Sequence, residues 1–520
     1  MRSATPSGHG EVLTEPAFDS WARLARDNAS AAAAWDFDVC GVPAVDLRAR
    51  ARAEAIVEAK TFSARMGVPV ASPPEHPDLL VMTGHQPQLY HPGIWVKDFL
   101  LQRLADQIGA AAIDLVVDSD GFDLVEVHAP CLRPVLSRCA QFLAVGGGDT
   151  CFACSSVPSA RDLSTFREAG AQMLATLPAP AIGRHFDSFC DAMDAARSDS
   201  ANLGEFITFA RRRFEAVAGT DYLELPVTSE ASTTAFAVFL ADIVRDAERF
   251  ATVYNAELAA YRERTGTRSA VQPFPDLRIE GGLVELPFWH LRSGGRSTLW
   301  ARTDGVPALV CDGEVLCELP SECEEAAAAL ASCVVRPAPK ALALTLYNRM
   351  FVADLFIHGT GGGRYDRVTD GVIRSFWGVE PPAFVVASMT MYLPLGARVV
   401  TAEEVDAVRQ TLNRLQHNPD QLLDELEFDD AEEHRRAVAL AGEKSRLVGE
   451  IAAPDADKKA IGRRIREVNA ELAALMEPYE MSLREELERL VEMQQASEIL
   501  TDRTYPFCFW SPLEVADKAR

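Results

Sequence analysis

The sequence predicts an α/β fold that carries an antiparallel β insert and a C-terminal helical arm. Three observations lead to this prediction. A strand–loop–helix pattern occupies residues 79–104, and segments of alternating apolar and polar residues fill 276–319. Farther along, apolar residues recur at steps of four and three between Ile461 and Tyr479. At 520 residues the chain is too long for one simple core, so two or three domains are expected.

The expected domains follow one another in chain order. A helix-favouring, Ala-rich segment (1–70) packs on the core, whose first part covers 71–275 and whose second part covers 336–400. Between these parts lies a β-rich insert (276–335) of four or five strands. Within the core, strands are expected near 79–82, 113–117, 221–225 and 383–393, and a second short strand is expected directly after the acidic turn that follows 113–117. Residues 160–265 are otherwise mostly helical. A helical arm (401–503) follows, and an aromatic tail (504–520) is expected to pack back on the core.

The arm has the seam spacing of a coiled coil. Its expected partner is the shorter run through Val438 and Leu447–Ile451, and Pro478 should kink the long helix or shift its register. Two interpretations of the arm stay open, a dimerising arm and a solvated helical bundle without a partner.

Charge and cysteine content restrict the class of protein. The chain has 51 basic and 76 acidic side chains, a formal net charge of −25, which argues against nucleic-acid and anionic-membrane partners. Neither a signal-type segment nor a membrane-length apolar run is found, so we expect a cytoplasmic protein. The eleven cysteines are expected to be reduced. Cys151, Cys154, Cys131 and Cys139 could form a zinc site, but the missing second CxxC pair argues against zinc.

The first candidate site is the loop at the end of the 79–82 strand. Its candidate residues are Thr83, Gly84, His85, Gln86 and His91, followed by Lys97 one turn into the helix. A strand end and a helix start in one crevice favour an anion such as phosphate. His85 and His91 would donate hydrogen bonds, Lys97 would neutralise charge and Gln86 would orient a substrate. Each residue alone is explained as well by a turn or the surface, but the group together favours a ligand site.

A second candidate is the segment Phe356–Asp366, where an apolar strand meets a glycine-rich loop. The candidate residues are His358, Gly359, Gly361, Gly362, Gly363 and Arg364. The glycines permit close backbone approach and positive φ, and Arg364 is placed to hold a phosphate or carboxylate. The pattern matches neither a dinucleotide fingerprint nor a P-loop, and three glycines also suit a plain tight turn.

A third candidate is the acidic turn Asp118–Asp123. Asp118 and Asp120 could hold a substrate ammonium, bind magnesium or act as a general base. Asp and Gly are also ordinary turn residues, so both interpretations stay open.

These motifs resemble a known family. The string Thr83-Gly84-His85-Gln86-Pro87, followed by Lys97, resembles the TGQQ…K segment of the bacillithiol biosynthesis cysteine-adding enzymes. The acidic turn, Phe356–Tyr365 and the Asp502–Phe507 ending are similar to that family's acidic turn, glycine-rich loop and tail. Three positions depart from the family: His85 replaces its first glutamine, Ser119 stands near its acidic-turn histidine, and Arg364 lies where an acid follows its glycine loop.

The resemblance implies a Rossmann-like core of the nucleotidyltransferase type, an antiparallel coiled-coil arm, a homodimer and a bound nucleotide (ATP or ADP). It also implies a ligase that joins the carboxylate of an amino acid to an amine of a small sugar-derived substrate. His85 and Lys97 would stabilise phosphate charge, and Asp118 or Asp120 would deprotonate the amine. Because of the departures, two alternatives remain: a catalytically silent nucleotide-binding scaffold acting through its coiled coil, and a nucleotidyltransferase acting on a small acid.

Overall fold

The computed structural model describes residues 5–132, 136–269, 274–396, 400–425, 428, 430–453 and 455–520. The chain divides into two compact units, one of residues 1–131, 138–393 and 503–520, the other of residues 132–137 and 394–502. The first unit is a mixed α/β structure, and the second is mainly helical. Among the described residues, no helix has both the length and the apolar character that crossing a membrane requires.

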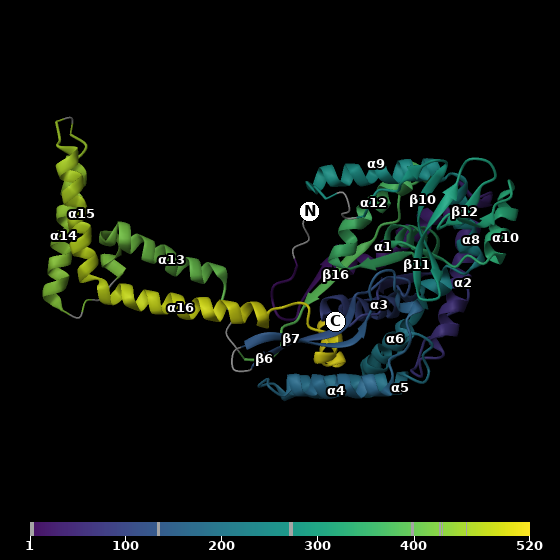
Figure 1. Cartoon of the computed structure of the whole chain (residues 1–520), viewed down its shortest axis with the longest axis horizontal. Helices are drawn as coiled ribbons and strands as arrows, with labels where there is room; N and C mark the ends of the chain where they lie inside the picture. The colour runs from purple at the N-terminus through teal and green to yellow at the C-terminus, as the bar shows by residue number, and fades with distance from the viewer. Residues whose placement is uncertain are drawn as a thin grey trace. The chain divides into compact units, whose positions relative to one another are not determined.

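A six-stranded sheet forms the centre of the first unit (Figure 1). Its strands are, in spatial order, β1 (Glu11–Glu15), β16 (Val385–Thr390), β15 (Leu355–His358), β4 (Leu80–His85), β5 (Ala111–Val116) and β8 (Leu223–Pro226). All neighbours are parallel except β1, which runs antiparallel to β16 at the edge. Numbered by their appearance in the chain and read from β8 to β16, the parallel strands thus lie in the order 3-2-1-4-5. This order reverses between β4 and β15, where Thr83 pairs with Ile357.

The helices that follow these two central strands cover opposite faces of the sheet. Helix α3 (Pro92–Ile108) follows β4 and bonds to Thr83, whereas α12 (Thr360–Trp377) packs Val368 and Val372 into the apolar cluster that contains Met82. Side chains alternate along a strand, so Met82 and Thr83 point to opposite faces. The connections after β4 and β15 therefore leave the sheet in opposite directions.

Further helices complete both layers. On the α12 face, α2 (Ala44–Ser63), α8 (Thr234–Arg245) and α9 (Ala247–Thr265) contribute to the same apolar cluster. On the α3 face, rings from α5 (Pro180–Ala196), α6 (Leu203–Glu215) and the C-terminal tail surround Trp95. The tail is fixed there because the Phe507 N–H donates to the Tyr90 carbonyl at 2.7 Å. The same unit also contains α1 (Trp21–Ala33), α4 (Ala160–Leu174), α7 (Val227–Glu230), α11 (Ala341–Tyr347) and α17 (Pro512–Lys518).

The insert is a separate antiparallel sheet in the order β13-β12-β11-β10-β14, with β9 paired to β10. Its strands are β9 (Ile279–Glu280), β10 (Leu283–Arg292), β11 (Gly295–Arg302), β12 (Ala308–Cys311), β13 (Glu314–Glu318) and β14 (Pro337–Pro339). Helix α10 (Cys323–Ser332) precedes β14. The alternating pattern therefore located an antiparallel sheet, whose last short strand lies beyond 335.

Two stretches of the first unit differ from the sequence-based expectation. The N-terminal segment is not wholly helical, because Glu11–Glu15 adds β1 to the sheet edge and β2 (Asp38–Val39) pairs with β3 (Val42–Pro43). After the acidic turn, β6 (Leu124–Leu132) and β7 (Leu136–Val145) form a two-stranded sheet where one short strand was expected. The residues of a strand alone do not predict these two elements, because each forms by pairing with another strand: β1 with the distant β16, and β6 with β7.

The second unit contains α13 (Ala402–His417), α14 (Ala431–Glu450), α15 (Lys458–Leu475) and α16 (Glu477–Leu500). Helices α14 and α15 pack through Leu440, Val468 and Leu472. Val438 is 53% exposed, so its expected place in the seam is wrong. The long helix is also interrupted: α15 ends at Leu475, and Pro478 lies in the first turn of α16. Proline lacks an N–H group and therefore fits a first turn better than a helix interior.

Candidate functional site

The carboxyl ends of the parallel strands bring the three predicted segments to one edge of the sheet. Residues 83–86 end β4, Asp118 and Asp120 follow β5, and His358 ends β15. In open parallel sheets, ligands bind outside the carboxyl ends where the strand order reverses. The reversal between β4 and β15 lies between the first and the second predicted segments.

Lys97 supports the strand end from inside the protein. Its ammonium is buried and donates to the Thr83 hydroxyl at 3.1 Å and to the Gly84 carbonyl at 2.8 Å. Burial lowers the pKa of Lys97, while Asp98 and Asp114 favour its charged form. At 2% exposure the ammonium is directed into the protein, so a direct contact with a ligand phosphate, as predicted, does not fit this geometry.

His91 has a structural role that excludes its predicted contact with a phosphate. Its Nδ1 atom accepts the Gly93 N–H at 2.9 Å, which caps the start of α3. Its Nε2 atom must then carry the proton, which it donates to the Met391 carbonyl at 3.0 Å. Because His91 fills the position that an anion would need, the start of α3 is closed.

His85 faces a small cavity as a neutral imidazole. Burial, and secondarily the Lys97 charge, lower the pKa of His85 to about 4. Its Nδ1–H group donates to the Gln86 carbonyl at 3.0 Å, which leaves Nε2 as an acceptor. The cavity, of about 10 Å³, is also lined by Tyr90, Asp114 and Arg211 and has the size of one water molecule. His85 therefore does not supply the positive charge that the sequence suggested.

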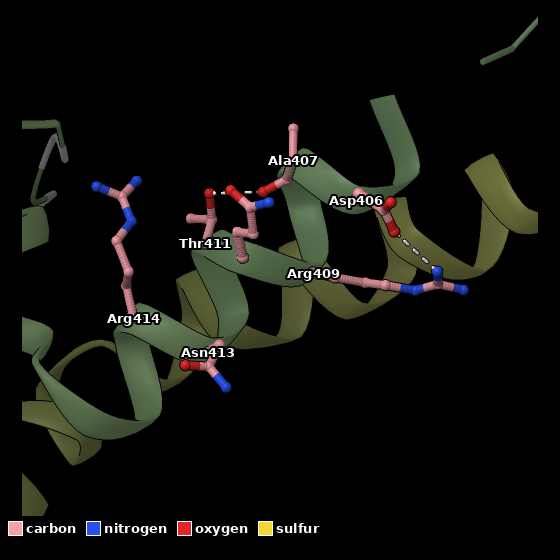
Figure 2. Close-up of a pocket in the computed structure, with 7 residues that line it drawn as sticks. Asp406, Ala407, Arg409, Thr411, Asn413 and Arg414 are labelled. Carbon is pink, nitrogen blue, oxygen red and sulfur yellow. Dashed lines mark hydrogen bonds and ion pairs between the residues drawn. The ribbon is translucent and has the colours of Figure 1, made fainter. Parts of the chain in front are cut away.

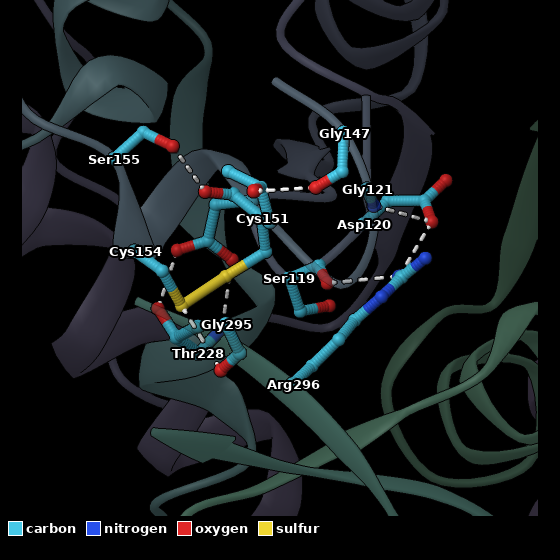
Figure 3. The surroundings of a disulfide bond; sticks show 12 residues. Ser119, Asp120, Gly121, Gly147, Cys151, Cys154, Ser155, Thr228, Gly295 and Arg296 are labelled. Atoms are coloured by element: carbon cyan, nitrogen blue, oxygen red, sulfur yellow. Dashed lines mark hydrogen bonds and ion pairs between the residues drawn. A yellow bond between two sulfur atoms is a disulfide. The ribbon is translucent and has the colours of Figure 1, made fainter. Parts of the chain in front are cut away.

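Asp120 joins the first and third predicted segments. It accepts a hydrogen bond at 2.8 Å from the Gln86 side chain. Arg296 donates to its other oxygen at 2.8 Å (Figure 3). The Asp120 side chain is 37% exposed, so it remains within reach of a ligand. Arg296 comes from β11 of the insert, which thereby contributes to the edge where the parallel strands end.

Asp118 occupies a different environment two residues earlier. It is buried and accepts hydrogen bonds from the Thr228 N–H at 3.0 Å and the Thr228 hydroxyl at 2.5 Å. Burial raises the pKa of Asp118 to about 6, although the bonds from Thr228 oppose this shift. A carboxyl group with this pKa can exchange a proton near neutral pH.

A disulfide holds the acidic turn in place. Cys151 and Cys154 are bonded to each other, and between them the N–H groups of Phe152 and Ala153 donate to the carbonyls of Asp120 and Asp118 (Figure 3). Cys131 and Cys139 form a second disulfide, so the expectation of reduced thiols is wrong for these four residues. The other seven cysteines are free thiols. Over the described ranges, no group of three metal-ligating side chains converges.

The glycine-rich segment is the first turn of α12 and not a loop. Gly359 is the N-cap, and Gly361, Gly362 and Gly363 lie inside the helix with negative φ, so the expected positive φ is wrong. A Cβ atom at Gly363 would lie 2.4 Å from Val386, which explains this glycine by close packing. Nothing lies within 4 Å of a Cβ at Gly361. No side chain of the described residues caps α12, so its start is open there.

His358 and Arg364 lie in different environments at the start of α12. His358 is buried, and its Nε2 atom lies 3.0 Å from Asp366. Although burial alone would raise the pKa of Asp366, the Arg349 guanidinium and His358 hold it well below its usual range. His358 thus anchors the first turns of α12 to its strand, whereas Arg364 lies on the exposed face of the helix.

Sequence reasoning missed three contributions to this edge, namely Arg296, Thr228 and a buried ionic network. In the network, Arg211 pairs with Asp98 at 2.5 Å, Glu224 at 2.6 Å and Asp114 at 2.8 Å. A signal for it was present, because Asp98 and Asp114 interrupt otherwise apolar buried segments. Arg296 and Thr228 had no such signal, since their partners are distant in the chain.

A separate hollow of about 680 Å³ lies on α13 of the second unit (Figure 2). Only residues of this helix line it, and Arg409 pairs with Asp406 at 3.0 Å. It contains none of the predicted site residues.

The chain was also compared with known proteins. No protein-family model matches it, and no curated protein does. The function must therefore be argued from the geometry of the sheet edge.

Proposed function

We propose that this chain is an enzyme that binds a nucleotide at the carboxyl edge of a Rossmann-like sheet. The observation that carries the proposal is the reversal of strand order between β4 and β15, with their helices on opposite faces. Such a reversal creates a crevice, and dinucleotide- and mononucleotide-binding sheets use it.

The start of α12 is the proposed phosphate position. It has no side-chain cap, and Gly361 and Gly362 are exposed. Open N–H groups together with the positive end of the helix dipole favour a phosphate group. The start of α3, where the sequence predicted an anion, is occupied by His91.

For the reaction we propose carbon–nitrogen bond formation between a carboxylate and an amine, as the resemblance to the cysteine-adding enzymes implies. Asp120, held by Gln86 and Arg296, would bind the amine, and Asp118 would accept its proton at near-neutral pH. Magnesium beside Asp120 is part of this proposal. Because His85 replaces the first glutamine of the family's motif, the proposal also allows a substrate other than that of the family.

The remaining parts of the resemblance are proposed with it. Helices α14 and α15 would form an antiparallel coiled coil, through which two copies of the chain would associate. Size-exclusion chromatography with light scattering distinguishes a monomer from a homodimer.

Isothermal titration calorimetry with ATP, ADP and AMP tests the nucleotide site. Gly361→Asp places a carboxylate at the open helix start, where it fits without a clash and repels phosphate. The matched control Gly361→Asn has the same size without the charge. We expect saturable binding to the wild type, weaker binding to Gly361→Asn because its Cβ atom restricts close approach to the backbone, and binding to Gly361→Asp that is at least tenfold weaker than to Gly361→Asn. Absence of binding to the wild type, or equal affinity for all three proteins, contradicts the proposal.

One observation favours the scaffold alternative: Lys97 and His91, predicted to act on a ligand, both serve the fold. A scaffold would bind nucleotide without turning it over. A nucleotidyltransferase would release pyrophosphate with a small acid alone, and a ligase would consume nucleotide only when both an acid and an amine are present.

A further inference from the structure

A second cavity, of about 280 Å³, lies beside the connection between β4 and α3. Three segments that are distant in the chain line it: the loop 88–91 with Ile94, strand β6, and the start of the C-terminal tail. Its polar lining includes Gln88, Glu126, His128 and Arg503. The volume is just below the range of ordinary small-molecule sites, so a ligand of a few carbon atoms fits it.

Arg503 brings a positive charge to this cavity without a matching negative charge. Its Nη2 atom donates to the Ser388 hydroxyl at 3.0 Å and to the Met389 carbonyl at 2.8 Å, both of which are uncharged. Its Nε atom is buried and has no hydrogen-bond partner within the described part of the chain. Among the described residues, no carboxylate lies within ion-pair distance of Arg503. Burial lowers the pKa of Arg503, as expected for a guanidinium that lacks a counter-ion.

Three other arginines of the same unit that face inward have carboxylate partners. Arg211 contacts four carboxylates, Arg349 contacts two, and Arg296 contacts Asp120. Proteins rarely keep a partly buried charge unpaired, because its lost hydration must be replaced. An anion from outside the chain would supply the missing charge.

The one carboxylate on the cavity wall does not fill this role. Glu126 lies 2.8 Å from the Nε2 atom of His128, and no ion pair between Glu126 and Arg503 is found in the described part of the chain. The cavity thus presents an unpaired guanidinium on one segment and an already bonded carboxylate on another.

We propose that this cavity binds a small anion, carrying a carboxylate or a phosphate group, through Arg503. Arginine is the side chain best suited to either group, because its donors match their oxygen atoms. The site is independent of the proposed nucleotide site, since it adjoins α3 and contains no residue of α12. It also gives the tail a function, because Arg503 both ties the tail to β16 and contributes the charge.

Calorimetry on the full chain with four probes, inorganic phosphate, pyrophosphate, succinate and citrate, tests the proposal. At least one probe should bind saturably, and the pair of phosphates against the pair of carboxylates identifies the preferred group. Arg503→Gln removes the charge but keeps a donor for the Met389 carbonyl, and it should weaken binding at least tenfold. Gln88→Glu adds a negative charge to the cavity without touching the tail, and it should have the same effect.

Two controls make the outcome decisive. Arg103→Gln removes another arginine that donates to a backbone carbonyl, that of Ala519, but that lies outside the cavity, so it should leave binding unchanged. Gly361→Asp should weaken nucleotide binding at least tenfold and preserve binding of the small anion, so the two sites fail separately. If no probe binds the wild type, or if Arg503→Gln and Gln88→Glu bind as the wild type does, the proposal is wrong. A probe whose binding is lost in Gly361→Asp and kept in Arg503→Gln also contradicts it.

Discussion

The connections after β4 and β15 share the same strand-to-helix arrangement, but the helix start is closed after β4 and open after β15. In each, a buried strand leads into a helix that has a glycine at its second position, Gly93 in α3 and Gly361 in α12. At α3 the N-cap is His91, which bonds to Gly93, whereas at α12 the N-cap is Gly359, which has no side chain to offer. The first connection consumes its polar groups within the fold, and the second leaves its helix start open. Polar residues in a loop therefore indicate a ligand only when the fold does not already use them.

Both helices are held by buried arginines, and the largest expected effect comes from removing the one behind α3. Arg211→Met leaves Asp98 and Asp114 buried without their guanidinium partner and leaves Glu224 with Arg212 alone, so we expect unfolding free energy to fall by about 4 kcal/mol. Urea unfolding followed by circular dichroism measures this. The exposed pair of Arg23 with Asp27 provides the control, since Arg23→Met should cost at most about 0.5 kcal/mol. Equal losses in both variants would contradict the role of the network.

The sequence predicted the strands and helix starts of this region well, because these depend on local pattern. The apolar run before Thr83 and the Pro92-Gly93 pair located β4 and α3, and helix α3 indeed begins at Pro92. Gln86 and Asp120 meet because they follow β4 and β5, neighbouring parallel strands that end at one edge of the sheet.

The roles of individual side chains could not be predicted in the same way. His91 bonds to Met391, which is 300 positions away, and Asp120 bonds to Arg296 of the insert, so local patterns carry no information on either contact. The glycine run was assigned to a loop for a related reason: only the packing of Gly363 against Val386 explains why glycine is required within a helix.

The pH dependence of stability tests whether Asp118, in the acidic turn beside the first connection, is closed to water. The folded pKa of Asp118, about 6, lies above its ordinary value near 4, so the protonated acid favours folding. This contribution is complete below pH 4 and is lost as the pH rises through 6. Relative to Asp118→Asn, the wild type should therefore lose about 3 kcal/mol between pH 4 and pH 7. Parallel stability curves for the two proteins, from urea unfolding at each pH, would show that Asp118 is open to water.

Alanine substitutions of Gly93 and Gly361 test the difference between the two connections most directly. Of the two, Gly93→Ala is expected to change the unfolding free energy more. A Cβ atom at Gly93 would lie 2.4 Å from the Met389 carbonyl oxygen and 2.6 Å from Arg503. The backbone must shift to relieve this overlap, so we expect a loss of about 2 kcal/mol of unfolding free energy. Thermal and urea unfolding measure it. A neutral result would mean that the start of α3 has more room than its contacts indicate.

Gly361→Ala is expected to have the smaller effect on unfolding free energy, and in the opposite direction. Gly361 has a helical, negative φ, and nothing lies within 4 Å of its Cβ position. Alanine there restricts the unfolded chain without straining the folded one, so we expect a gain of about 0.5 kcal/mol, measured by urea unfolding. A protein that keeps glycine where alanine is more stable keeps it for a reason other than stability. Close approach of a ligand to the backbone of α12 is such a reason, and it predicts that Gly361→Ala binds nucleotide more weakly although it is more stable. Loss of stability in Gly361→Ala would instead indicate that glycine is needed there for the fold, and the difference between the two connections would disappear.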